Sequence, residues 1–127
     1  MKTDVTVALI LLACVLAGGL WMTASVEAAA ARIEASAAEI GELAAMGEWG
    51  RAAEALDSYE AQWKKSLGWL RLLTPDDKTD GVSEGYRQLG TYIQLKDATG
   101  SAEACTALQL AAEAMLDNER LTWQTLL

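Results

Sequence analysis

The sequence predicts an all-α protein, in which an N-terminal transmembrane helix continues into an antiparallel bundle of about four helices. Three observations lead to this prediction. Ala, Leu, Glu, Gln, Arg and Lys dominate the composition and Pro75 is the only proline, which favours helices over strands. Apolar residues recur at steps of three and four over most of the chain. A long apolar run without a charged side chain precedes these amphipathic stretches.

The apolar run extends from Val5 to Val26. Its length corresponds to about 33 Å of helix, enough for a hydrocarbon core of roughly 30 Å. Its Leu, Ile and Val residues contribute about −3 to −5 kcal/mol on membrane-insertion scales. Trp21 falls where an interfacial aromatic side chain is expected. We therefore expect residues 5–26 to contact membrane lipid.

The span divides the chain into a cytoplasmic N-terminus at residues 1–4, the anchor at 5–26 and an extracytoplasmic helical domain at 27–127. Lys2 and the amino terminus precede the span, so the positive-inside rule places the N-terminus inside and the C-terminal domain outside. The expected location is the cytoplasmic membrane, with a single pass.

Two alternatives to an uncleaved anchor remain open. Val26-Glu27-Ala28 has small residues at the spacing of a signal-peptide cleavage site, and cleavage there would release the domain. Leu11-Leu12-Ala13-Cys14 suggests a lipoprotein, although apolar residues continue after Cys14. The apolar run exceeds the roughly 7–15 residues of a typical signal peptide, and the helical pattern continues without a break. Both features favour the anchor.

The first amphipathic stretch runs from Val26 to Gly47. Its apolar residues are Val26, Ala29, Ile33, Ile40 and Leu43. No cluster of Pro or Gly separates it from the span, so we expect one continuous helix of about 40 residues. Val26, Ile33 and Ile40 also recur every seven residues, so self-association through this stalk is an alternative use of the same residues.

A second helix is expected after a break at Met46-Gly47-Glu48. Its apolar stripe comprises Trp49, Ala52, Ala53, Leu56, Tyr59, Trp63, Leu67, Leu70 and Leu73. The two tryptophans of the stripe are interpreted as core rather than as a ligand cage, because each buries a large apolar area. Trp69 lies off the stripe, so it either packs against another element or is exposed as a contact residue.

Two further helices follow Thr74-Pro75-Asp76-Asp77, which supplies an N-cap residue, a proline at the first helical position and acidic side chains in the first turn. The third helix is expected to bury Val82, Tyr86, Leu89 and Ile93 and to end near residues 97–100. Ser101 is expected to cap the fourth. The apolar face of the fourth helix comprises Ala104, Cys105, Leu108, Ala111, Ala112, Met115 and Leu116.

The chain ends in apolar residues, and Trp123, Leu126 and Leu127 imply that this terminus packs on another surface. Together with Trp69 they form the expected interaction surface. A weak internal similarity relates residues 48–56 to residues 97–105: an acidic residue at the start of each helix precedes small and apolar residues at helical spacing. It indicates two helical hairpins, arranged either as a tetratricopeptide-like array or as a plain four-helix bundle.

The net charge of −8 and the absence of histidine restrict the function. Nucleic-acid binding is not expected, because it needs a basic patch and the positive charges here are scattered among carboxylates. No disulfide is expected, since the membrane boundary separates Cys14 from Cys105. No side chain is placed as a general base, so neither enzymatic activity nor a cofactor is expected.

One acidic motif requires separate treatment. Asp76-Asp77-x-x-Asp80 has the spacing with which prenyl synthases hold magnesium, but those enzymes need a larger helical cavity and a second aspartate-rich motif. A calcium loop starting at Asp76 would place Lys78 and Arg87 at ligand positions. We therefore interpret these residues as a helix start and a solvated loop, and expect no metal.

Several residues stand in an order found in a known family. They are the apolar N-terminal run, Trp49 with Ala53 and Leu56, Trp63, Leu89-x-x-Tyr92-Ile93 before Asp97, and Glu119-x-Leu121-Thr122-x-x-x-Leu126-Leu127. This arrangement resembles, over almost the whole chain, a small bacterial family catalogued as domain of unknown function 4363. The resemblance implies a single-pass, membrane-anchored helical domain without an assigned activity. The chain departs from it at Thr74-Pro75-Asp76-Asp77, where relatives often carry a histidine, and at Gln124-Thr125.

These features predict a membrane-anchored interaction or scaffold module at the outer face of the cytoplasmic membrane. Its partner would be another membrane or envelope protein. The alternative is a helical bundle that senses or binds a small molecule, which would require a sealed apolar pocket.

Overall fold

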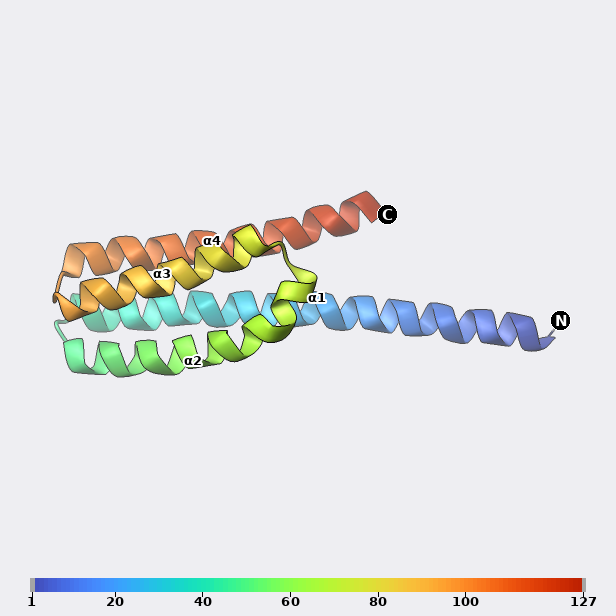
Figure 1. Cartoon of the computed structure of the whole chain (residues 1–127), viewed down its shortest axis with the longest axis horizontal. Helices are drawn as coiled ribbons and strands as arrows, with labels where there is room; N and C mark the ends of the chain where they lie inside the picture. Colours follow the sequence, from blue (N-terminus) through green and yellow to red (C-terminus); the bar gives the residue numbers. More distant parts are fainter. Residues whose placement is uncertain (1, 127) are drawn as a thin grey trace.

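The computed structural model describes residues 2–126, except for the side chains of Trp123 and Leu126. Within this range the chain forms four helices and no strand: α1 (Lys2–Ala45), α2 (Trp49–Leu73), α3 (Asp76–Gln94) and α4 (Ala98–Leu126). Successive helices run antiparallel (Figure 1). α1 packs against both α2 and α4, and α3 packs against both α2 and α4. The contact between the first and last helices closes a four-helix bundle, as the composition and periodicity predict.

α1 is one continuous helix of 44 residues, which confirms that the apolar run and the stalk share a helix. Its two halves differ in their surroundings. Its N-terminal half projects beyond the bundle, whereas its C-terminal half lies among the other helices (Figure 1). Burial begins at Val26 and continues to Ala44.

The bundle core consists of the apolar stripes that the sequence predicts. Its buried members include Val26, Ile33, Ile40, Leu56, Trp63, Leu70, Val82, Tyr86, Leu89, Ile93, Leu108 and Met115. The stalk residues Val26, Ile33 and Ile40 are at most 2% exposed. Stalk pairing through these side chains would therefore require the bundle to open.

The two hairpin corners at the far end of the bundle have the same backbone structure. After α1, the amide of Gly47 donates to the carbonyl three residues earlier (3.1 Å) and the amide of Glu48 to the carbonyl five residues earlier (2.9 Å). After α3, the amides of Lys96 and Asp97 repeat this pattern, at 3.1 and 2.9 Å. Both are Schellman motifs. The residue with positive φ is Gly47 (75°) in the first and Lys96 (54°) in the second.

These matching corners give the weak internal similarity a structural basis. Residues 48–56 and 97–105 each follow a Schellman corner and start a helix that returns toward the anchor side. The repeated unit is thus a helical hairpin, α1–α2 and then α3–α4. The two hairpins close on each other, so the bundle alternative holds rather than an open array.

Two predicted helix caps are wrong. Asp97, not Ser101, caps α4: its Oδ1 accepts a hydrogen bond from the amide of Gly100 (2.9 Å). Ser101 lies within α4, fully buried, and its Oγ has no hydrogen-bond partner within the described part of the chain. Thr74 does not cap α3 either. It ends α2, where its amide donates to the Leu70 carbonyl at 2.8 Å.

The close packing at this corner explains the glycine at position 100. A Cβ atom on Gly100 would lie 2.2 Å from a ring carbon of Tyr92, so any larger residue would displace the tyrosine.

Asp97 can cap α4 because it directly precedes the helix, and the backbone amide three residues later has no partner within the helix. Ser101 cannot serve as the N-cap, because α4 already begins at Ala98 and Ser101 lies inside the helix.

Candidate functional site

The most distinctive feature of the molecule is the exposed apolar half of α1. Ten large apolar side chains between Val5 and Trp21 are each at least half exposed. By length and composition this helix could cross a membrane, and none of its most apolar 18-residue window is buried. A signal sequence at an N-terminus would satisfy the same criterion. The segment is compatible with a membrane anchor.

Trp69 packs against the anchor helix rather than standing free. The ring centroids of Trp21 and Trp69 are 6.3 Å apart, with the planes tilted by 45°. The last turns of α2, which include Trp69, bend across α1 in the view of Figure 1. Three residues further along, Leu72 is 84% exposed. The predicted contact role of Trp69 thus becomes a contact within the chain, beside an exposed leucine.

The end of α4 lies beside α1 at a similar level. Thr23 Oγ1 donates a hydrogen bond to Glu119 Oε1 at 3.3 Å. An open depression of about 260 Å³ lies on the surface here. Residues of both helices line it, including Arg120 and Gln124 of α4. Of the predicted interaction residues, Trp123 and Leu126 lie in the last turns of α4. Their side chains, and all of Leu127, lie outside the described structure.

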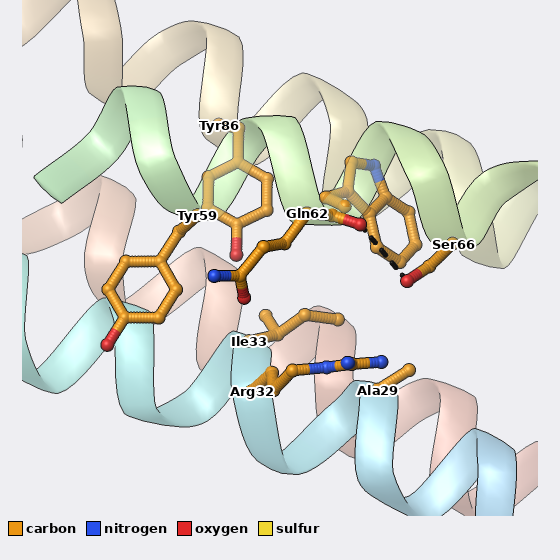
Figure 2. Close-up of a pocket in the computed structure, with 8 residues that line it drawn as sticks. Ala29, Arg32, Ile33, Tyr59, Gln62, Ser66 and Tyr86 are labelled. Atoms are coloured by element: carbon orange, nitrogen blue, oxygen red, sulfur yellow. Dashed lines mark hydrogen bonds between the residues drawn. The ribbon is translucent and has the colours of Figure 1, made fainter.

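Figure 2 shows a pocket between α1, α2 and α3. Its volume is about 10 Å³, which is room for about one water molecule. Two of the aromatic residues that line it already form hydrogen bonds through their polar atoms. Trp63 Nε1 donates to Ser83 Oγ at 2.9 Å, and the hydroxyl groups of Tyr86 and Ser36 form a hydrogen bond at 2.8 Å. This pocket is a packing gap and not a site for an organic ligand.

A wider groove lies between α2 and α3. It is open to solvent, has a volume of about 410 Å³ and includes Asp57, Glu60 and Arg87 in its lining. Gly90 forms part of its floor: a Cβ there would lie 3.4 Å from a methyl carbon of Leu56. The groove is a shallow surface with charges of both signs, unlike the enclosed apolar pockets that bind small molecules.

The titratable side chains of the bundle core are held neutral. Burial raises the pKa of the Cys105 thiol to about 11 and also raises the pKa of the Tyr86 hydroxyl, although its hydrogen bond with Ser36 partly opposes this. The hydrogen bond from Tyr59 to Glu39 raises the pKa of Tyr59. Within residues 2–126 no group of three or more Asp, Glu, Cys or His side chains could hold a metal ion.

Comparison with known proteins identifies a family. Residues 20–126 match the family described as "Domain of unknown function (DUF4363)". The chain belongs to this family. No curated protein and no solved structure matches the chain.

The DUF4363 match covers the whole bundle and begins at the end of the exposed apolar segment. The residues on which the resemblance is visible in the sequence are mostly packing residues: Leu56, Trp63, Leu89 and Ile93 are all less than 10% exposed. The DUF4363 match therefore coincides with the bundle, and it transfers no activity.

Proposed function

We propose that this protein is a membrane-anchored helical interaction module, which holds its bundle at the outer face of the cytoplasmic membrane and binds another membrane or envelope protein there. The observation that carries the proposal is the exposed apolar half of α1. A continuous apolar surface of this size is unfavourable in water and favourable in a bilayer.

The packing of Val26 supports a retained anchor over a cleaved signal peptide. Val26 is fully buried in the bundle, and α1 continues through this position without interruption. Cleavage after Ala28 would remove Val26 from the core, together with the Thr23 contact to Glu119. An intact helix instead ties the bundle rigidly to the membrane segment.

The tip of the bundle farthest from the anchor is the surface that we assign to the partner. Met46 and Leu95 occupy equivalent positions in the two hairpin corners and are 61% and 70% exposed. Met46 follows the last residue of α1 and lies about 30 Å from Val26, the end of the apolar run, at about 1.5 Å per residue. Two exposed apolar side chains at the same end suit a protein contact, in which a few apolar anchors supply most of the affinity.

The alternative function, small-molecule binding, has less support. Ligand pockets typically enclose roughly 300–1,000 Å³, whereas the pocket between α1, α2 and α3 holds about 10 Å³. The larger groove between α2 and α3 is open. We therefore propose protein interaction as the primary role and no enzymatic step.

Photocrosslinking in native membranes tests the proposal. A photoreactive residue is placed at Met46 or Leu95, and at Leu110 as a control that is 60% exposed on the side of the bundle. We expect the two tip positions to crosslink to the same membrane or envelope protein and Leu110 not to do so. The partner proposal fails if the tip positions capture only lipid or this chain itself.

A further inference from the structure

We infer that the end of α4 is a second membrane-contacting element, and that residues 120–126 lie in the interfacial zone of the bilayer beside the anchor. This inference rests on the proposed membrane anchoring through α1. It assigns the apolar C-terminal end of the chain to lipid rather than to a protein partner.

The pairing of α4 with α1 fixes the level at which α4 ends. Glu119 lies beside Thr23, and α4 runs antiparallel to α1 and continues beyond the end of α2 (Figure 1). The seven residues from Arg120 to Leu126 remain helical and extend about 10 Å further toward the N-terminus. The end of α4 is therefore level with a position near Leu16.

The apolar run of α1 is too short for the hydrocarbon core to lie entirely beyond the end of α4. If the hydrocarbon core began only beyond the end of α4, about 12 apolar residues would remain to cross it. They would span about 18 Å, against a core of roughly 30 Å. With the bilayer surface near Trp21, the apolar segment spans most of the core, and the end of α4 enters by about 5–10 Å, as interfacial helices do.

The charge pattern of both helices changes at this same level. α1 has no charged side chain from Val5 to Val26, and α4 has no charged side chain after Arg120. Since Thr23 and Glu119 are neighbours, the uncharged parts of the two helices begin side by side. A boundary shared by two segments so distant in sequence matches the plane of a membrane surface.

The described side chains at the end of α4 suit an interfacial position. Leu121 is 62% exposed. The hydroxyl groups of Thr122 and Thr125 donate within the helix, to the carbonyls of Asn118 (3.0 Å) and Leu121 (2.8 Å), so neither requires water. The last carbonyl groups of a helix have no partner within it and favour hydration, which places this end in the interface rather than in the hydrocarbon core.

Thiol labelling of the full-length chain in lipid vesicles tests the inference. Leu121→Cys is compared with Leu110→Cys, because these leucines lie on the same helix and are 62% and 60% exposed. The native thiols give little background: Cys105 is buried with its pKa raised to about 11, and Cys14 lies within the proposed span. The unsubstituted chain measures what background remains.

In vesicles of phosphatidylcholine and phosphatidylglycerol, we expect a water-soluble maleimide to label Leu121→Cys at least about fivefold more slowly than Leu110→Cys, because lipid covers the first position. A fluorophore at position 121 should also be quenched by nitroxide-labelled lipids, and one at position 110 should not. A ratio below about fivefold overturns the inference. Slow labelling without lipid quenching also overturns it, because protein would then cover the site.

Flotation of the vesicles separates this inference from the anchoring on which it rests. If the chain floats with the vesicles and Leu121→Cys labels rapidly, α1 is anchored and the inference about α4 is wrong. If the chain does not float, the anchoring proposal itself fails, and the inference fails with it.

Discussion

The two halves of α1 share one uninterrupted backbone but bury their apolar side chains differently. From Val5 to Trp21 the apolar residues point outward on all sides and are mostly Leu, Ile and Val. From Val26 to Ala44 only one face is buried, and small residues occupy much of it: Ala29, Ala30, Ser36, Ala37 and Ala44. The first half fits a solvent of lipid chains, and the second fits the surfaces of two neighbouring helices.

This difference shows that apolar content alone does not decide how a helix is used. Small side chains at the buried face allow α2 and α4 to approach α1 closely, because close packing needs short side chains at the points of contact. Between Val5 and Trp21 the large Leu, Ile and Val side chains are instead exposed, and none of the most apolar window is buried. The change occurs between Trp21 and Val26, where Trp69 and Glu119 reach α1 from the other helices.

The largest expected effect comes from placing charge in the exposed half. Leu11→Arg combined with Val15→Arg should abolish membrane association, because two arginines near the bilayer centre cost about 6 kcal/mol, more than the about 3–5 kcal/mol that the apolar residues supply. Flotation with vesicles measures the loss. The bundle should unfold at the same urea concentration as before.

The control for this prediction is Leu11→Ala combined with Val15→Ala, which shortens the same side chains without adding charge. It should stay with the membrane. If the arginine variant remains with the vesicles after an alkaline wash, the exposed half of α1 is not a lipid-spanning anchor. The proposed difference between the two halves of α1 is then wrong.

A matched pair of isoleucines in the same helix separates the two halves directly. Ile40 is fully buried and Ile10 is 57% exposed. Ile40→Ala should lower the free energy of unfolding of the bundle by about 2–5 kcal/mol, through lost burial and the cavity that remains. Ile10→Ala should leave it unchanged. Urea unfolding followed by far-UV circular dichroism measures both free energies. Equal losses in the two variants would contradict the difference between the two halves of α1.

Much of the difference between the two halves of α1 could be predicted from the sequence, because hydrophobic periodicity and composition determine it. The apolar run, the long first helix and the buried faces of all four helices follow from helical periodicity. The partner of Trp69 could not be predicted, since a residue off the apolar stripe gives no sign of how α2 bends. The hydrogen bond between Ser36 and Tyr86 was also missed, because it joins residues 50 positions apart.

The candidate site was less predictable than the fold. Trp69 lies off the apolar stripe of its helix in the sequence, and its contact with Trp21 depends on tertiary structure. The hydrogen bond between Thr23 and Glu119 likewise depends on the pairing of α1 with α4. No sequence pattern around either residue predicts it. The N-cap of α4 shows the same limit: Ser101 was the expected cap, and the backbone of the corner places Asp97 at the cap position instead.

A smaller effect is expected from the cysteine of the buried face. Burial raises the pKa of Cys105 from 9.0 to about 11 in the folded chain. The neutral thiol is therefore favoured by folding, and its contribution is complete below pH 9. As the pH rises from 9 to 11 the unfolded chain loses this proton first, so the free energy of unfolding falls, with a slope of at most about 1.4 kcal/mol per pH unit from this group.

Cys105→Ala isolates this contribution, because alanine retains a small apolar side chain without the thiol. We expect its free energy of unfolding to fall less steeply than that of the unsubstituted chain between pH 9 and 11. Tyr86, whose pKa burial also raises, accounts for part of the remaining slope. Identical slopes in the two chains would show that the Cys105 thiol ionises in the folded bundle as readily as in the unfolded chain.

The smallest expected effect concerns the two corners at the far tip, where bundle stability can be changed without altering the exposed apolar half of α1. Lys96 adopts a left-handed backbone with φ of 54°, the conformation that Gly47 adopts in the equivalent corner. Lys96→Gly should raise the free energy of unfolding by about 0.5–1 kcal/mol, because glycine adopts this conformation without steric cost. Gly47→Ala should lower it by a similar amount. Urea titration of both variants measures the changes, and flotation should be unaltered, since neither corner lies near the apolar half of α1. A gain in stability in both variants would mean that the two corners, despite their matching hydrogen bonds, are not equivalent.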